Sequence, residues 1–308
     1  MDSDVSLEPS VSVLLNVWAG DDCQAVVRSV QSVTAQTLLP NELIIVVDGP
    51  IQPDIRNYLA YLPMSVPFPV VVYQLEDNHG LWFARNVGLR LSNSDLVALQ
   101  DADDVMHPDR LSVQRQWLLR HGASVVGSIA VEFENASNRI ICFRRTPLRS
   151  ELRLQDFLIR NGFHHSSVMF LKPDITAIGG YRNLPGVEDI DLWRRLLSTQ
   201  ARLVNIPMAL QALGTDLALL RRRRFSKAIF HVEIQLATHL LSLLPGYRKV
   251  LVPLSCAIRV GYRLLPLKAM ALAQKLFLRS TDVMLPNDMD EFLSERPMDR
   301  STTLRIDK

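Results

Sequence analysis

Four short apolar runs alternate with helical segments in the first hundred residues, and this alternation constrains the fold more than any other feature. Each run is rich in Val, Ile or Leu and is predicted to be a buried strand; the runs are 11–17, 42–48, 68–75 and 95–100. The segments between them, 21–36, 54–62 and 80–92, space their apolar residues as amphipathic helices do. Strands that alternate with helices form a mostly parallel sheet with helices on both faces. We therefore predict an α/β domain of the Rossmann-like type.

The pattern continues beyond the fourth strand, although less regularly. Helices are predicted over 108–122 and 187–198, the second with acidic residues in its first turn, where the helix dipole favours them. Further strands are predicted over 124–133, 164–172 and 201–207, with a hairpin around 135–139. In open α/β sheets, ligands bind beyond the carboxyl ends of the strands. Asp48 and Asp101 both lie at such ends, so we expect them to meet in one crevice.

Three carboxylates, Asp101, Asp103 and Asp104, stand within four positions directly after the fourth strand. Crowded carboxylates repel one another, and this arrangement does nothing for stability by itself. Its strongest physical use is to bind a hard divalent cation, Mg²⁺ or Mn²⁺, through oxygen ligands. Mg²⁺ commonly shares such a site with substrate phosphates, so the expected third party is a nucleotide diphosphate. The alternative is an acidic surface turn that simply ends the strand.

An ordered set of motifs extends across about residues 10–215: VSVLLNVW, QTLLP, ELIIVVDGP, ARNVGL, LQDADD followed by PDRL, and GGYRNLPGVEDIDLW. Through these motifs the sequence resembles the family-2 glycosyltransferases of the GT-A fold, and in particular the bacterial members that build exopolysaccharide and O-antigen. The resemblance implies an inverting, metal-dependent glycosyltransferase that uses a nucleotide-diphosphate sugar. Two motifs depart from the common form, because Val47-Asp48 stands in place of paired aspartates and NVWAG ends the first strand.

The resemblance also implies roles for the residues around the donor. Asn16 and Trp18 would face the donor's base, and Trp18 could stack on it because an aromatic face suits a flat heterocycle. Asp48 would hydrogen-bond the base or the ribose, and Arg85 would help to neutralise phosphate. Asp101 would contact the ribose or a metal-bound water.

The remaining acids divide between the metal and the chemistry. The resemblance makes Asp103 the principal ligand of Mn²⁺ or Mg²⁺, which would stabilise the departing diphosphate. It leaves Asp104 with a turn-capping role. Asp189 would be the general base that takes the proton of the acceptor hydroxyl, and one base opposite the leaving group implies a single displacement with inversion.

The acceptor side of the site is expected around the same helix. Glu188 and His165 are candidate acceptor contacts, whereas Asp191 is expected to cap the helix. The alternative for the whole EDID sequence is helix capping, and the alternative for His165 is a buried structural histidine.

A basic segment follows the predicted catalytic domain. Residues 221–279 contain twelve Lys or Arg and one acid. We predict a catalytic domain over 1–220, basic amphipathic helices over 221–280 that lie on a membrane surface, and a polar tail over 281–308. Arg221 and Arg222 would bind the diphosphate of a lipid-linked saccharide acceptor. The alternative is a helical subdomain packed on the catalytic domain.

Targeting signals are not evident in the sequence. The N-terminus has acids where a signal peptide has bases, and no run of about 18 apolar residues is present. The three cysteines are far apart and form no C-x-x-C, which argues against disulfides or a zinc site. These features predict a cytoplasmic protein held peripherally at the inner face of the cell membrane.

Two other functions, that of a nucleotidyltransferase and that of a non-catalytic binding protein, fit the sequence less well. A nucleotidyltransferase should have a basic, Gly-rich loop after the first strand, and the sequence there, WAGDDCQAV, is acidic. A non-catalytic protein that binds membranes or nucleic acid would have no use for the acids around Asp189. Nucleic acid is not expected as a partner.

Overall fold

The computed structural model describes residues 8–135, 140–144, 146–148, 150–157 and 161–215, together with residues 257, 279 and 280. Arg221, Arg222 and almost all of the predicted membrane-surface segment and polar tail lie outside the described residues. Within the described part of the chain, no helix is long and apolar enough to cross a membrane.

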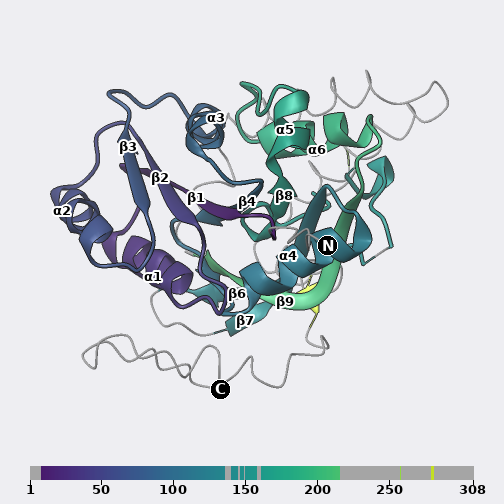
Figure 1. Ribbon diagram of the computed structural model, residues 1–308, viewed down its shortest axis with the longest axis horizontal. Helices are drawn as coiled ribbons and strands as arrows, with labels where there is room; N and C mark the ends of the chain where they lie inside the picture. Colours follow the sequence, from purple (N-terminus) through teal and green to yellow (C-terminus); the bar gives the residue numbers. More distant parts are fainter. Residues whose placement is uncertain are drawn as a thin grey trace, which may run out of the picture.

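One twisted sheet forms the centre of the molecule (Figure 1). Its strands are β1 (Val11–Trp18), β2 (Glu42–Asp48), β3 (Val70–Gln74), β4 (Leu96–Asp101), β5 (Val105–Met106), β6 (Val125–Glu134), β7 (Ile140–Arg144), β8 (Met169–Leu171), β9 (Leu203–Thr215) and β10 (Arg279–Ser280). The order is β10-β7-β6-β8-β4-β1-β2-β3, with β9 beside β6 and β5. The four strands β3, β2, β1 and β4 are all parallel, as the alternation of strands and helices predicts.

The second half of the sheet is mixed. Strand β8 runs antiparallel to β4 and β6, while β9 runs parallel to β6. The predicted hairpin is present as the antiparallel pair β6 and β7. This change of direction after β4 leaves the carboxyl end of β4 facing the loops of the second half.

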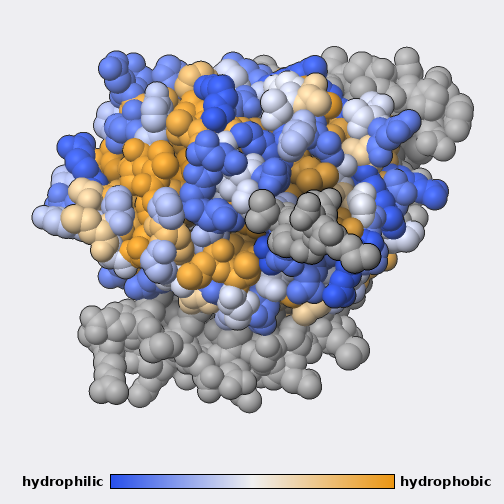
Figure 2. Space-filling model, in the orientation of Figure 1, coloured by the Kyte–Doolittle hydropathy of each residue, from blue (hydrophilic) through white to orange (hydrophobic). Residues whose placement is uncertain are grey.

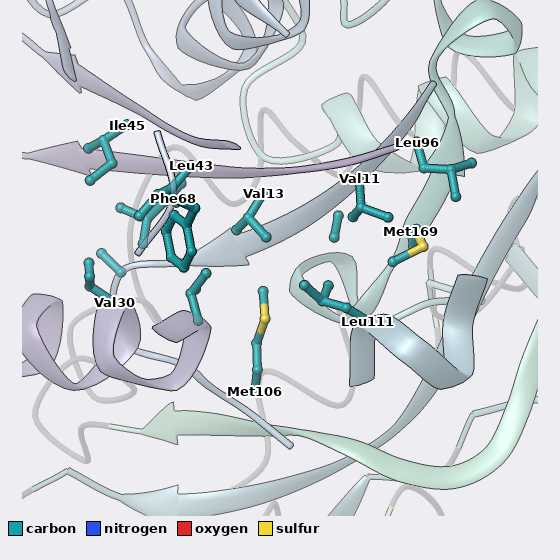
Figure 3. Packing of buried hydrophobic residues seen from close by; sticks show 14 of the residues in the cluster. Val11, Val13, Val30, Leu43, Ile45, Phe68, Leu96, Met106, Leu111 and Met169 are labelled. Atoms are coloured by element: carbon teal, nitrogen blue, oxygen red, sulfur yellow. The ribbon is translucent and has the colours of Figure 1, made fainter. Parts of the chain in front are cut away.

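Helices cover both faces of the sheet. They are α1 (Cys23–Thr34), α2 (Pro53–Tyr61), α3 (Leu81–Leu91), α4 (Arg110–His121), α5 (Lys172–Ala177) and α6 (Glu188–Leu197). Figure 1 shows α1, α2 and α4 on one side and α3, α5 and α6 on the other, and the two apolar cores follow the same division. In Figure 3, Val30 of α1 and Leu111 of α4 point towards Val13 of β1 and Met169 of β8. The sheet is therefore buried on both faces, which explains its nearly continuous apolar strands.

Local signals account for most helix boundaries. Asp22 caps α1, because its carboxylate accepts a hydrogen bond from the Ala25 amide at 3.0 Å. Helix α4 ends at Gly122, whose left-handed backbone (φ 55°) suits a glycine. In α3, Leu81 is exposed, although its spacing predicts a buried position. Leu81 is the first residue of α3, and at this position the apolar face of the helix is not directed towards the sheet.

The predicted strand over 164–172 is wrong at its beginning. Residues His165–Ser167 form one turn of 3-10 helix, η3, and only Met169–Leu171 pair as a strand. The Ser167 hydroxyl and the Ser167 amide both donate to the His164 carbonyl, at 2.8 and 2.9 Å. Small hydroxyl side chains compete for backbone hydrogen bonds in this way and favour turns. The turn directs successive side chains towards different parts of the site described below.

The outer edge of the parallel half carries exposed apolar residues. Strand β3 pairs only with β2 among the described strands, and Val72 and Tyr73 on it are exposed, as are the nearby Tyr61 and Met64. Figure 2 shows hydrophobic surface gathered along this side of the molecule, on the left of the view.

Candidate active site

The strand register brings four predicted donor residues to one edge of the sheet. Asn16 on β1 lies opposite Asp101 on β4, and Trp18 lies opposite Asp48 on β2. Trp18 is half exposed at 52% and lies over Gly20, where a Cβ atom would meet the indole at 2.3 Å. The Asn16 side-chain amide nitrogen is buried and has no hydrogen-bond partner among the described residues. A buried donor without a partner is costly, so this position is suited to a ligand that supplies an acceptor.

Asp48 holds the loop that leads into α3. Its two carboxylate oxygens accept hydrogen bonds from the amides of His79 and Gly80 at 2.8 and 2.9 Å. Gly80, with φ 88°, is the cap residue directly before the helix. Asp48 therefore has a structural task that the sequence did not indicate, in addition to any contact with a donor.

Arg85 on α3 lies between the two acidic regions. Its guanidinium is buried, 3.6 Å from an oxygen of Asp101 and 3.9 Å from an oxygen of Glu188, and it lies 5.4 Å from the centre of the Tyr181 ring. A buried charge needs compensation, and these carboxylates and the ring supply it. Arg85 thus links the predicted donor side to the first turn of α6.

Asp104 anchors the acid loop, residues 101–104, to the second half of the sheet. Its buried carboxylate accepts hydrogen bonds from the Ser166 hydroxyl of η3 and from the Gly214 amide of β9, the second at 2.9 Å. Burial, and then the charges of Asp103 and Asp101, hold the pKa of Asp104 well above its usual range. The turn itself is closed by backbone atoms, since the Asp104 amide donates to the Asp101 carbonyl at 3.2 Å. The predicted turn-capping role for its side chain was therefore wrong, because that side chain ties the loop to the second half of the sheet.

A buried arginine stands behind the acid loop. Arg110, the arginine of the PDRL motif, is fully buried and donates to the side chains of Gln114, Gln100 and Gln211 and to the carbonyls of Leu99 and Val168. Burial lowers its pKa to about 9, which still leaves it charged at neutral pH, while Asp104 and Asp101 favour the charged form. Its positive charge offsets part of the repulsion within the loop. The sequence gave Arg110 a place in a motif but no role.

Asp21 adds another carboxylate to the acid loop's surroundings. Its carboxylate accepts a hydrogen bond from the Trp18 amide at 2.9 Å. Burial, assisted by the charges of Asp103 and Asp101, raises its pKa to about 7. Nothing in the sequence indicates that Asp21 lies near the loop.

These residues fit a divalent cation in part. Among the described residues, no three His, Cys, Asp or Glu side chains converge as a complete metal-ligand group. Mg²⁺ and its relatives need only one or two carboxylates when water and substrate phosphates complete the shell. Asp101, whose side chain is 43% exposed, and the partly exposed Asp103 on the same turn meet that requirement. They are the residues that could hold such an ion.

Asp189 occupies the first turn of α6. Its oxygens accept hydrogen bonds from the side-chain amide of Asn161 at 2.5 Å and from the Ile190 amide at 2.7 Å. Burial, and then the charge of Glu188, raise the pKa of Asp189 to about 6, while Arg85 acts in the opposite direction. A carboxylate with such a pKa can take a proton at neutral pH more readily than an ordinary aspartate. Asn161 gave no sequence signal, because it lies in an irregular loop.

The neighbouring acids of α6 have different surroundings. Glu188 is buried beside Arg85, and its second oxygen has no hydrogen-bond partner among the described residues. The prediction that Asp191 caps the helix was wrong: its carboxylate binds the Arg195 guanidinium at 2.7 Å, one turn further along. The residue at the cap position is Val187, which provides no side-chain hydrogen bond. Asp191 lies on the buried face, where an arginine partner is available.

His165 lies behind Asp189. Its side chain is only 9% exposed, its Nδ1 is 4.0 Å from an Asp189 oxygen, and its Nε2 is 3.2 Å from the Tyr181 hydroxyl. Its ring packs against Trp193 with the centroids 5.5 Å apart. The structure therefore brings Asp101, Arg85, Glu188, Asp189 and His165 together, with Tyr181 as a member that the sequence did not reveal.

Comparison with known proteins identifies the chain. The family model described as Glycosyl transferase family 2 matches residues 16–175, which is more than half of the sequence and includes the end of β1, the acid loop and η3. The chain belongs to glycosyl transferase family 2. It is a glycosyltransferase.

Relatives and a solved structure agree with this assignment. The amylovoran biosynthesis glycosyltransferase AmsE of Erwinia amylovora is 29% identical over 69% of this chain and 79% of its own length. The UDP-Gal:alpha-D-GlcNAc-diphosphoundecaprenol beta-1,3-galactosyltransferase of Escherichia coli is 29% identical over 66% and 73%. The mannosyltransferase PcManGT of Pyrobaculum calidifontis, solved with GDP-Man and Mn²⁺, superposes with a TM-score of 0.60 at 15% identity, covering 87% of this chain and 76% of its own. The fold of this glycosyltransferase is GT-A.

Proposed function

We propose that this family 2 glycosyltransferase moves a sugar from a nucleotide-diphosphate donor to a saccharide acceptor by a single displacement with inversion. Asp189 takes the proton of the attacking hydroxyl. Asp103, assisted by Asp101, holds a divalent cation, Mn²⁺ or Mg²⁺, which supplies charge stabilisation for the departing diphosphate. The observation that carries the proposal is the pair of acidic centres joined through Arg85, which contacts Asp101 on one side and Glu188, next to Asp189, on the other.

The donor side has features that suit a nucleotide. The half-exposed Trp18 offers an aromatic face at the end of β1, and Asn16 offers a buried donor with no partner among the described residues. The buried Arg85 faces the same edge and can attract phosphate. Support for the nucleotide and the cation also comes from the structural neighbour, which was solved with GDP-Man and Mn²⁺.

The acceptor is proposed from the relatives and from the basic segment. One relative acts on a diphosphoundecaprenol-linked sugar and another serves amylovoran biosynthesis. Residues 221–279 carry twelve basic residues against one acid, which suits an anionic membrane surface. We therefore propose a lipid-linked saccharide acceptor, used in surface polysaccharide synthesis at the inner face of the membrane, with Arg221 and Arg222 near its diphosphate and Glu188 near its sugar.

The proposal is tested by calorimetric binding of UDP, GDP, ADP and CDP with and without Mn²⁺. One nucleotide should bind, and Mn²⁺ should strengthen its binding by about 100-fold, since a metal contributes several kcal/mol to a phosphate site. Asp103→Asn should abolish the part of the affinity that depends on Mn²⁺. Asp54→Asn, an exposed aspartate on α2, is the matched control and should bind as the unaltered protein does.

Two results would contradict the proposal. Binding that does not depend on Mn²⁺, in a sample with a cooperative thermal transition, would remove the cation from the mechanism. Retention of the Mn²⁺ effect in Asp103→Asn would move the metal ligand to another residue.

A further inference from the structure

Tyr181, His165 and Asp189 form a chain of neighbouring polar groups. The Tyr181 hydroxyl is 3.2 Å from His165 Nε2, and His165 Nδ1 is 4.0 Å from the Asp189 oxygen that Asn161 also contacts. None of the described residues hydrogen-bonds His165 Nδ1. Asp189 is therefore the only acid that the described residues place within an ion-pair distance of this nitrogen.

His165 is neutral in these surroundings. Burial, and then the charge of Arg85, hold its pKa well below the usual value. In a neutral imidazole, one nitrogen donates a hydrogen bond and the other accepts one. Burial likewise raises the pKa of the Tyr181 hydroxyl, so that hydroxyl keeps its proton and can donate it to Nε2. The remaining hydrogen then lies on Nδ1 and faces Asp189.

Tyr181 is itself held by α3. The Asn86 side chain accepts a hydrogen bond from the Tyr181 amide at 2.9 Å and donates one to the Tyr181 carbonyl at 2.7 Å. The preceding residue is Gly180, with φ 65°, where a Cβ atom would meet the Asn86 oxygen at 2.4 Å. Two hydrogen bonds to its backbone, and a close approach that requires glycine at the preceding position, thus hold Tyr181 in place. The hydroxyl of Tyr181 in turn sets the tautomer of His165.

The same turn of 3-10 helix also reaches the acid loop. Within η3, His165 points to Asp189 and the next residue, Ser166, donates to Asp104. Its neighbour Ser167 anchors the turn through the His164 carbonyl. One short element therefore holds both acidic centres at a fixed separation.

We propose that His165 is a positioning residue for Asp189: its Nδ1–H, set by Tyr181, donates to Asp189 Oδ2 when the site closes on its substrates and so holds the carboxylate in its ionised form and orientation. This inference rests on the proposed function, in which Asp189 is the base. Hydrogen bonds in sites without substrate are often long and shorten in the complex. Oδ1 accepts a hydrogen bond from the Ile190 amide, and its other lone pair can take the proton of the acceptor hydroxyl.

The groups that face Asp189 come from three elements. Glu188 on α6 raises its pKa, and Arg85 on α3 lowers it. His165 on η3 and Tyr181 before α6 are uncharged and act through hydrogen bonds. Asn161 is also uncharged and donates to Oδ2. Loss of the second donor on Oδ2, the Nδ1–H of His165, should therefore raise the pKa of Asp189 further, since a hydrogen bond to the charged form favours that form.

The test compares His165→Asn with His165→Gln. The amide nitrogen of Asn can occupy the position of Nδ1, whereas the amide of Gln reaches the position of Nε2. The measured quantity is hydrolysis of nucleotide sugars that carry the nucleotide selected by the binding panel, in which water replaces the acceptor. We expect kcat to fall by about 10- to 100-fold in His165→Gln, as for other residues that orient an active group, and to be largely kept in His165→Asn. In His165→Gln, the acidic limb of the pH profile, which is the range in which kcat falls as the pH is lowered, should move to higher pH.

Controls separate this inference from a structural role and from the proposed function. Tyr181→Phe keeps the ring beside Arg85 and should show the same movement of the limb, and it carries the test if His165→Gln does not fold. His164→Gln should leave the profile unchanged. Equal losses in the Asn and Gln variants, or an unmoved limb, would overturn the inference. Asp189→Asn is measured beside them: if it keeps full turnover, the proposed base fails, whereas if it alone loses turnover, only the role of His165 fails.

Discussion

The acid loop after β4 and the first turn of α6 both carry aspartates and both contact Arg85, but their surroundings differ. The acid loop has the buried cation of Arg110 behind it, and Asp101 on its rim is 43% exposed. The first turn of α6 has Glu188 beside Asp189, and its compensating cation, Arg85, is shared with the loop. The loop is thus arranged to keep negative charge in contact with solvent, where a cation can bind, whereas α6 makes ionisation of Asp189 harder.

The comparison teaches that the same side chain acquires different chemistry from its neighbours. Burial and a neighbouring acid raise the pKa of Asp189 to about 6, a value suited to a base near neutral pH. Burial also holds the pKa of Asp104 well above its usual range, yet both of its oxygens are occupied by Ser166 and Gly214. A raised pKa marks a base only where the carboxylate can also reach a substrate.

The largest expected effect is a loss of turnover without a loss of nucleotide binding. Asp189→Asn should lower kcat by about 10³-fold, because the acceptor hydroxyl loses its general base, while the nucleotide affinity in the presence of Mn²⁺ stays unchanged. Steady-state kinetics and calorimetry on the same sample measure both quantities. Asp174→Asn, in the first turn of α5, is the matched control and should affect neither. A parallel loss of nucleotide binding in Asp189→Asn would make α6 part of the donor site and end the distinction between the two regions.

The next effect concerns stability and applies only to the acid loop. Arg110→Met should lower the free energy of unfolding by about 3–5 kcal/mol, because it leaves Asp104 without its buried cation and removes the hydrogen bonds that Arg110 donates to five acceptors. Chemical denaturation measures this change. Arg120→Met, on the exposed face of the same helix, should change stability by no more than about 0.5 kcal/mol. Equal effects in the two variants would show that the cation behind the loop is not needed.

The smallest effect is a pH dependence that only α6 should cause. The protonated carboxyl of Asp189 cannot accept a proton, so kcat should fall about tenfold for each pH unit below its pKa of about 6 and level off above it. A pH profile of kcat at saturating donor measures this limb. A limb near the ordinary aspartate value of 3.8 would mean that Asp189 is not the group that titrates.

The sequence predicted the parallel half of the fold with few errors. The spacing of apolar residues located β1, β2, β3 and β4 and the helices between them, and the position of acids directly after β4 and at the start of α6 located both acidic centres. Such patterns are local, because strand and helix periods are set by the backbone of the segment itself. The resemblance to a family added candidate roles for those acids. The beginning of the strand over 164–172 was misjudged, since hydroxyl side chains there favoured a turn.

What the tertiary structure decided is which polar groups meet. Arg110 reaches Gln211, Asn161 reaches Asp189, and Ser166 reaches Asp104, all across long intervals of sequence. No periodic pattern encodes such pairs, because a buried polar group accepts any partner with suitable geometry and the meeting of loops selects one. The sequence by itself thus determined a layered α/β domain with two groups of acids, while the separation of those groups, the cation between them and the raised pKa of Asp189 arise from tertiary contacts.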